Sequence, residues 1–198
     1  MFSKHPSFIL GFHGCDQKTG EAILAGNSEL QSSENAHDWL GHGVYFWENN
    51  PTRALQWAVE RKENPFLGRT SVAQPFVVGA IIDLGNCLDF LDAQSFPLLD
   101  LAYNTLVSSC KKKDVEIPQN SGGKDLFKRE LDCAVIQTLH SVCKAKSIKF
   151  DSVRGLFSEG KPVYPGSRIH RKDHIQICIR NRKSIKGYFR VKDTTGLH

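Results

Sequence analysis

The sequence has no long hydrophobic run and no closely spaced pair of cysteines. No segment approaches the roughly 20 apolar residues of a membrane-spanning helix, and MFSKHPSFILGFHGC at the N-terminus lacks a signal-peptide pattern. The six cysteines form no C-x-x-C motif, so their spacing does not support a zinc site. We therefore expect reduced thiols, no bound metal, no membrane association and a cytoplasmic location.

Large aromatic rings are scarce and unevenly placed. The chain has three tryptophans and four tyrosines, and two of the tryptophans with one tyrosine fall in GHGVYFWENNPTRALQWA, residues 41–58. No G-x-G-x-x-G follows the first predicted strand, which argues against a Rossmann dinucleotide site. The glycine-punctuated stretch 41–58 therefore needs another explanation.

Acidic residues are rare in the last quarter of the chain. From Lys144 to Lys192 there are 14 lysines and arginines against three acids, an excess of 11 positive charges. Because the whole chain of 198 residues carries +5, the remainder carries −6. This asymmetry indicates either a polyanionic partner or a solvated basic face that the acidic part balances in space.

Apolar runs and turn residues predict the order of secondary structure. Helices are expected at 19–26, 49–62, 91–110 and 125–143, and strands at 8–15, 44–47, 75–85, 148–155, 174–181 and 184–191. Strands begin and end the chain, with helices inserted in the middle and short connections between the last strands. This pattern predicts one α+β domain over 1–198, with largely antiparallel sheets and a helical insertion at about 91–143.

The segment HIQICIRN alternates between apolar and polar side chains. Ile175, Ile177 and Ile179 are expected to face a core, so Gln176 faces the opposite side of the strand. Such a polar row is commonly solvent-exposed, and it gains a functional meaning only where other polar groups converge on it.

Three stretches, taken in order, resemble the ADP-ribosyltransferase fold in its diphtheria-toxin and poly(ADP-ribose) polymerase branch. These are GFHGC, then GHGVYF with Tyr45 standing 32 residues after His13, and finally HIQICIRN. GHGVYF is similar to the Gly-x-Gly-x-Tyr-Phe motif of that branch, whose signature is a His, a Tyr and a Glu on separate strands. The resemblance covers 8–58 and 148–191 and implies a split antiparallel β-sandwich with flanking and inserted helices.

The resemblance also implies a site for NAD as co-substrate. His13 would bond the adenosine ribose, the backbone of Gly14 would hold the nicotinamide carboxamide, and Tyr45 would stack on the nicotinamide ring. Trp57, or less surely Gln56, would supply the second ring. Aromatic faces suit a cationic pyridinium, and glycine allows close backbone approach.

Other positions implied by the resemblance surround the dinucleotide. Residues 27–40 would form the loop over it, while Phe46 and Trp47 are expected to lie in the core. Arg154 is expected either to pair with the pyrophosphate or to be an ordinary surface arginine.

The chain departs from the family pattern at its catalytic carboxylate. Gln176 stands where the resemblance places Glu, which favours transfer of a single ADP-ribose over polymer formation and leaves room for a binding-only domain. Glu159, in the loop where this fold binds its acceptor, is expected either to compensate as a base or cation stabiliser or to be an exposed acid. Arg171 and Lys172 are expected to bind the acceptor.

Three functions follow as hypotheses. The leading one is a mono-ADP-ribosyltransferase, a toxin or defence effector that modifies nucleic acid (RNA or DNA) or protein, with an antitoxin protein as a candidate neutralising partner. An NAD glycohydrolase uses water as the acceptor instead. A non-catalytic module would bind ADP-ribose or nucleic acid through the basic strands.

Overall fold

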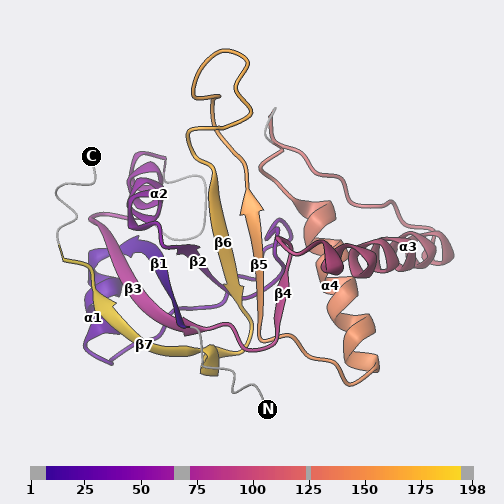
Figure 1. Ribbon diagram of the computed structural model, residues 1–198, viewed down its shortest axis with the longest axis horizontal. Helices are drawn as coiled ribbons and strands as arrows, with labels where there is room; N and C mark the ends of the chain where they lie inside the picture. Colours follow the sequence, from indigo (N-terminus) through magenta and orange to yellow (C-terminus); the bar gives the residue numbers. More distant parts are fainter. Residues whose placement is uncertain (1–7, 65–71, 124–125, 193–198) are drawn as a thin grey trace.

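The computed structural model describes residues 8–64, 72–123 and 126–192 and has an α+β architecture, as the sequence predicts (Figure 1). The strands are β1 Phe8–Asp16, β2 Val44–Glu48, β3 Pro75–Asp83, β4 Cys87–Asp89, β5 Ser152–Phe157, β6 His174–Ile179 and β7 Ile185–Arg190. The helices are α1 Gln17–Leu24, α2 Pro51–Glu63, α3 Phe96–Lys113 and α4 Glu130–Ala145, with single 3-10 turns at Ala93–Ser95 and Arg182–Ser184. None of the helices in these ranges has the length and apolar character to cross a bilayer.

The strands form one sheet in the order β4-β5-β6-β2-β1-β3-β7. Every pairing is antiparallel except that of β4 with β5, which confirms the largely antiparallel prediction. The two halves of the sheet are joined narrowly, because β1 and β2 pair only through Gly11–Glu48 and Phe12–Trp47.

One buried cluster is shared by both halves of the sheet. Val44, Phe46, Ile177 and Ile179 come from β2 and β6, and they pack with Val78, Ala80 and Ile82 of β3. Both halves of the sheet therefore contribute to one common core. The prediction that Ile177 and Ile179 face a core and that Phe46 belongs to it is confirmed; each is at most 1% exposed.

Helices cover the sheet at separate places. Ile23 of α1 packs into the core between the halves, whereas Ala54 of α2 packs with Phe12, Trp47 and Val77 on the other face of the sheet.

The first helix begins earlier than predicted, because the side chain of Asp16, and not that of Thr19, caps it by accepting from the Lys18 N–H. Pro51 lies in the first turn of α2, as expected.

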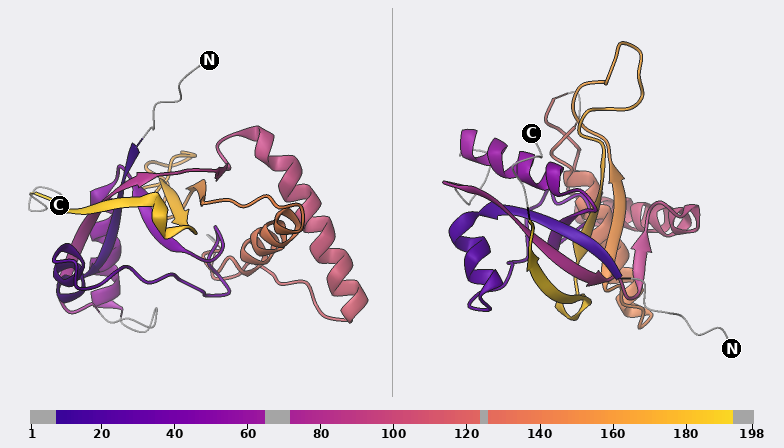
Figure 2. Two further views of the ribbon diagram at one scale, coloured as in Figure 1. Left: turned by 90° about the horizontal axis from the view of Figure 1, so that it is seen from below. Right: turned by 60° about the vertical axis from the view of Figure 1, so that its left-hand side comes forward.

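The helical insertion lies between β4 and β5, at the end of the molecule far from α1 and α2 (Figures 1 and 2). Helices α3 and α4 pack together, and Ala102 and Leu139 join Val153 and Cys178 of the sheet in one buried cluster. Because α4 begins at Glu130, the predicted start at 125 is wrong; Asp125 itself lies outside the described residues. Thus α2 and α4 cover two parts of the same face, and the row of β2 and β6 side chains runs between them.

Gly14 allows β1 to lie directly against α2. A Cβ atom at this position would be 2.1 Å from the backbone oxygen of Ala54, a distance that no side chain can relieve. Alanine at position 14 would therefore push the helix away from the sheet.

We expect Gly14→Ala to lower the free energy of unfolding by about 2 kcal/mol or more, the usual cost of overpacking. Gly187→Ala is the matched control, since a Cβ on Gly187 in β7 meets no atom within 4 Å. Its effect should stay within about 0.5 kcal/mol. Urea unfolding of both variants measures the difference, and equal stability of the two would contradict the close approach.

Candidate functional site

Tyr45 and Gln176 lie on the same face of the sheet, on neighbouring strands. In the pairing of β2 with β6, Tyr45 is opposite Cys178 and Trp47 is opposite Gln176. Tyr45 and Gln176 are therefore diagonal neighbours, which lie about 7–8 Å apart in antiparallel pairs. His174 and Cys178 extend this polar row along β6.

His13 occupies the gap where β1 and β2 separate. Its Nδ1 is 2.8 Å from the backbone oxygen of Tyr45, so Nδ1 donates and the ring bridges the two strands. Burial lowers the pKa of His13 from 6.5, and the bond to Tyr45 only partly opposes this, so the ring is neutral at pH 7. The structure thus brings His13, Tyr45 and Gln176 together on three adjacent strands.

The backbone of Gly14 faces the same gap. The Leu10 oxygen accepts from the Asn49 N–H at 2.9 Å, so Leu10 directs its backbone groups toward β2. In a strand every second residue does the same, which gives Phe12 and Gly14 this direction too. Pairing with β2 stops at Phe12, so the N–H and C=O of Gly14 point to the place where the strands have separated.

The Tyr45 side chain is held by the end of the preceding loop. Its hydroxyl donates to the Gly41 oxygen at 2.7 Å and accepts from the Leu40 N–H at 3.0 Å. The ring is partly buried against the cluster that includes Leu40 and Cys178. Burial raises the pKa of Tyr45 well above 10, so the phenol is neutral and serves as a positioned ring.

Gln176 is oriented by Trp39, a residue that sequence reasoning missed. The indole Nε1 lies 2.6 Å from the Gln176 Oε1. Because an indole N–H only donates, the amide oxygen must face Trp39 and the NH₂ group must face elsewhere. Gly155 makes room for this contact, since a Cβ there would lie 2.8 Å from the Trp39 ring. Trp39 belongs to the segment 27–40 that was predicted to cover the dinucleotide.

A chain of aromatic rings links Trp39 to His13. Ring centroids are 5.0 Å apart for Trp39–Phe157, 5.6 Å for Phe157–His174, 6.0 Å for His174–Trp47, 5.7 Å for Trp47–Trp57 and 6.5 Å for Trp57–His13. Trp57 therefore lies close to His13, and its expected contact with the nicotinamide ring stays a prediction. The expectation that Trp47 is buried is confirmed, but its Nε1 has no hydrogen-bond partner in the described ranges.

Glu159 is linked to this chain of rings through Arg53, a residue that sequence reasoning also missed. Arg53, in the first turn of α2, is 5% exposed, contacts the Glu159 carboxylate through Nη2 and lies 5.9 Å from the centre of a Trp47 ring. The Glu159 side chain is only 20% exposed, so the prediction of an exposed loop acid is wrong. Its predicted catalytic role stays a prediction.

Arg154 lies on the opposite face from Tyr45 and Gln176. Its Nε and Nη2 bond the Glu48 carboxylate at 2.5 and 2.9 Å, and its Nη1 bonds Asp89 at 2.9 Å. These bonds raise its pKa, and all three nitrogens already face carboxylates. Arg154 is therefore not part of the candidate site, and the expected pyrophosphate contact stays a prediction.

Arg171 and Lys172 belong to the loop 158–173, which projects beyond the sheet between β5 and β6 (Figure 1). Lys172 Nζ lies 2.8 Å from Glu60 of α2, which ties the base of the loop to the helix beside Arg53. Tyr164 and Ile169 are each 61% exposed on this loop. The loop therefore presents basic and apolar groups next to the candidate site.

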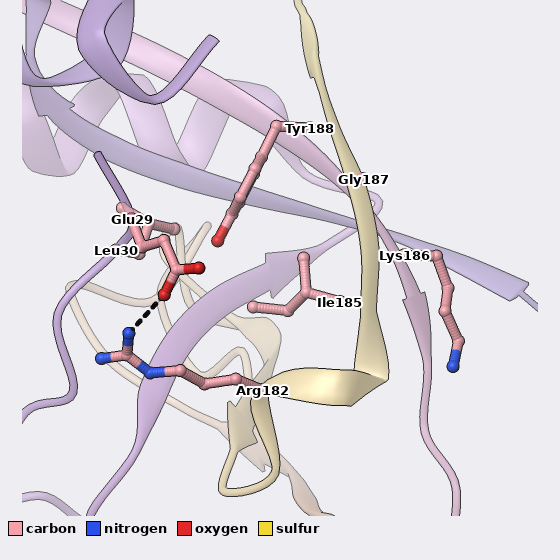
Figure 3. A pocket seen from close by; sticks show the side chains of 7 residues that line it. All are labelled: Glu29, Leu30, Arg182, Ile185, Lys186, Gly187 and Tyr188. Atoms are coloured by element: carbon pink, nitrogen blue, oxygen red, sulfur yellow. Dashed lines mark hydrogen bonds and ion pairs between the residues drawn. The ribbon is translucent and has the colours of Figure 1, made fainter. Parts of the chain in front are cut away.

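A small cavity lies elsewhere, between β7 and the first residues of the segment that follows α1 (Figure 3). Its volume is about 120 Å³, and Arg182 crosses it to bond Glu29 at 2.6 Å. Small-molecule sites usually have about 300–1,000 Å³, so this cavity does not fit a dinucleotide.

The cysteines have the form that the sequence predicts. All six are free, and five of them are buried while Cys87 is half-buried. Burial raises the pKa of Cys178 to about 12, so this thiol beside Tyr45 is not a nucleophile at pH 7. Within the described ranges no cluster of His, Cys, Asp or Glu could hold a metal ion.

Comparison with known proteins gives a distant relative without an assigned function. An uncharacterized protein of Methanocaldococcus jannaschii is 26% identical over 195 residues, which cover 88% of this chain and 83% of that protein. No family model matches the chain, and no solved structure gives a significant match. The similarity to the archaeal protein extends over most of both chains.

Proposed function

We propose that the protein is a mono-ADP-ribosyltransferase that takes ADP-ribose from NAD and transfers it to a macromolecule. One observation carries this proposal: His13, Tyr45 and Gln176 lie on three adjacent strands at the point where the sheet opens. The three side chains share one short stretch of the sheet, within the length of a bound dinucleotide.

The gap between β1 and β2 supplies the groups that a nicotinamide ring needs. The backbone of Gly14 offers one donor and one acceptor to the carboxamide, and Tyr45 and Trp57 offer ring faces to the cationic pyridinium. Such faces contribute about 0.5–2 kcal/mol each. Because Nδ1 of the neutral His13 donates to Tyr45, Nε2 keeps its lone pair and accepts a hydrogen bond from a ribose hydroxyl without adding charge.

Gln176 acts on the nicotinamide ribose. In the reaction the C1′–N1 bond breaks, the electron pair goes to the nicotinamide nitrogen, and positive charge develops on the ribose. The Gln176 NH₂ group, turned away from Trp39, donates to the 2′-hydroxyl oxygen and fixes the ribose. The amide brings no negative charge, which favours one transfer rather than repeated additions to a growing polymer.

Glu159 supplies the negative charge that Gln176 lacks. It extends from the loop 158–173 toward the chain of rings, and Arg53 of α2 binds its carboxylate. A carboxylate on this side stabilises positive charge on the ribose through space in a water-poor site. Arg171 and Lys172 on the same loop attract a polyanionic acceptor, which favours nucleic acid.

Incubation with labelled NAD tests the proposal, with total RNA, sheared DNA and a protein extract as separate acceptor probes. Label in one of these fractions supports transfer. Free ADP-ribose as the sole product would assign an NAD glycohydrolase instead. Intact NAD, together with salt-sensitive binding to RNA or DNA, would assign a binding module.

Tyr45→Ala should lower kcat/KM for NAD by roughly 30-fold, because it removes about 2 kcal/mol of ring contact with the pyridinium. Tyr45→Phe is the control. It keeps the ring and loses only the hydroxyl bonds to the backbone of Leu40 and Gly41, so its loss should be several-fold smaller. Nicotinamide release measures both variants, and equal turnover of Tyr45→Ala and wild type would remove the ring from the site.

Trp39→Phe should reduce kcat by about 3- to 10-fold with little change in KM, since it removes one hydrogen bond and leaves a ring against Phe157. The Gln176 amide then rotates freely and the ribose is positioned less often. Gln176→Ala should reduce kcat further. In the double variant the loss from Trp39→Phe should vanish, because its target is gone. Losses that simply multiply would contradict the positioning role of Trp39.

A further inference from the structure

His174 has a buried ring nitrogen without a partner in the described part of the chain. The residue is 5% exposed, and its Nδ1 lies 2.6 Å from the backbone oxygen of Lys172. A carbonyl oxygen only accepts, so Nδ1 carries the proton and Nε2 keeps its lone pair in the neutral ring. Nε2 itself makes no hydrogen bond. Buried polar atoms are rarely left unpaired, and an oriented imidazole with a free lone pair is the usual form of a general base.

The surroundings of His174 keep its ring neutral. Burial is the largest influence and lowers its pKa from 6.5; Arg53 of α2 lowers it as well. The Lys172 carbonyl, Glu159 and Asp173 raise it without reversing the shift. The strands on either side contribute the rings of Trp47 and Phe157. At pH 7 Nε2 is therefore available to take up a proton.

His174 lies between the ribose position and the loop 158–173. It precedes Gln176 by two residues on β6, so both side chains are on the same face. The Nε1 of Trp47 and the Nε of Arg53 are buried next to it, and neither has a hydrogen-bond partner in the described ranges. The three side chains are neighbours, since the Trp47 ring lies 6.0 Å from the His174 ring and 5.9 Å from the Arg53 guanidinium carbon. One buried acceptor and two buried donors in this cluster thus lack partners in the described ranges, which fits a ligand carrying a hydroxyl or amino group.

We propose that His174 is the general base of the transfer, a role that rests on the proposed function. Its Nε2 takes the proton of the acceptor hydroxyl or amino group as the oxygen or nitrogen lone pair forms a bond to C1′. The C1′–N1 bond breaks, nicotinamide leaves with that electron pair, and His174 later releases the proton to water. Since Nε2 is covered in this structure, the acceptor enters between the loop 158–173 and α2, which meet at the Arg53–Glu159 contact.

His174→Asn is the most direct test. The Asn amide can still donate to the Lys172 carbonyl from the position of Nδ1, but nothing replaces Nε2. Label transfer to the RNA, DNA or protein fraction that the wild type modifies should fall by roughly 100-fold or more. Binding of NAD, measured by calorimetry, should be unchanged. At saturating NAD, where protonation of His13 no longer limits binding, the wild-type rate should decline below pH 6.5 as the lowered pKa of His174 is passed and the base is protonated, and the variant should lack this decline.

His140→Asn serves as the matched control. This second buried histidine, on α4 against Phe150, also has an unpartnered Nε2, and burial lowers its pKa to about 3. Its replacement should leave transfer and the pH profile unchanged. If His174→Asn fails to fold, His174→Ala with added imidazole replaces it, and rescue of transfer by imidazole is expected.

The outcomes separate the two proposals. A wild-type protein that leaves NAD intact overturns the proposed function and with it the role of His174. A wild-type protein that transfers ADP-ribose, while His174→Asn transfers equally well with the same pH profile, overturns only the role of His174. Loss of NAD binding in His174→Asn would contradict it as well, because the residue would then act on the nucleotide.

Discussion

The pairing between β1 and β2 stops after two residue pairs, and the proposed site depends on where it stops. Had the ladder continued, the N–H and C=O of Gly14 would be used in pairing with β2. Instead the strands separate, and the His13 ring spans the gap to the Tyr45 carbonyl at 2.8 Å. Gly14 is then free to contact α2 on one side and to direct its N–H and C=O into the gap. Because β1 and β2 pair over only two residues, the N–H and C=O of Gly14 are left for other hydrogen bonds while the core stays buried.

A buried charge organises the other side of the site. Arg53 is almost fully covered by rings and helix, where an unpaired guanidinium would be strongly unfavourable. The Glu159 carboxylate and that of Glu60, 3.5 Å from Nη1, compensate it, and the contact with Glu159 holds the loop 158–173 against α2. The position of a loop that would recognise the acceptor is therefore set by the desolvation of a residue in α2. In the proposed reaction, an acceptor that reaches His174 would exchange this ion pair for contacts of its own.

The sequence predicts the class of fold and the residues that local patterns specify. Alternation in β6 places Gln176 opposite the isoleucines, and the resemblance to the ADP-ribosyltransferase fold is what points to His13, Gly14 and Tyr45. Trp39, Arg53 and the orphaned nitrogen of His174 were missed because their meaning depends on partners far along the chain: Trp39 meets Gln176 after 137 residues and Arg53 meets Glu159 after 106. No local pattern encodes such contacts. Strand alternation predicts that Arg154 and Val153 point to opposite faces of the sheet. It does not predict the pairing of Arg154 with Glu48 and Asp89.

The groups nearest to the expected ribose are all neutral at pH 7: two histidines whose pKa burial lowers, a phenol whose pKa burial raises and an amide. A neutral wall would not favour positive charge on the ribose by itself, so in the proposed reaction NAD would bind there without being cleaved. The carboxylate of Glu159 changes this only when it is freed from Arg53, since a paired carboxylate presents little net charge. If an acceptor carrying phosphate takes over Arg53, Glu159 is released toward the ribose at the moment the nucleophile arrives. Cleavage of NAD would then be tied to the presence of the acceptor, which explains how an amide at position 176 is compatible with transfer and restrains hydrolysis.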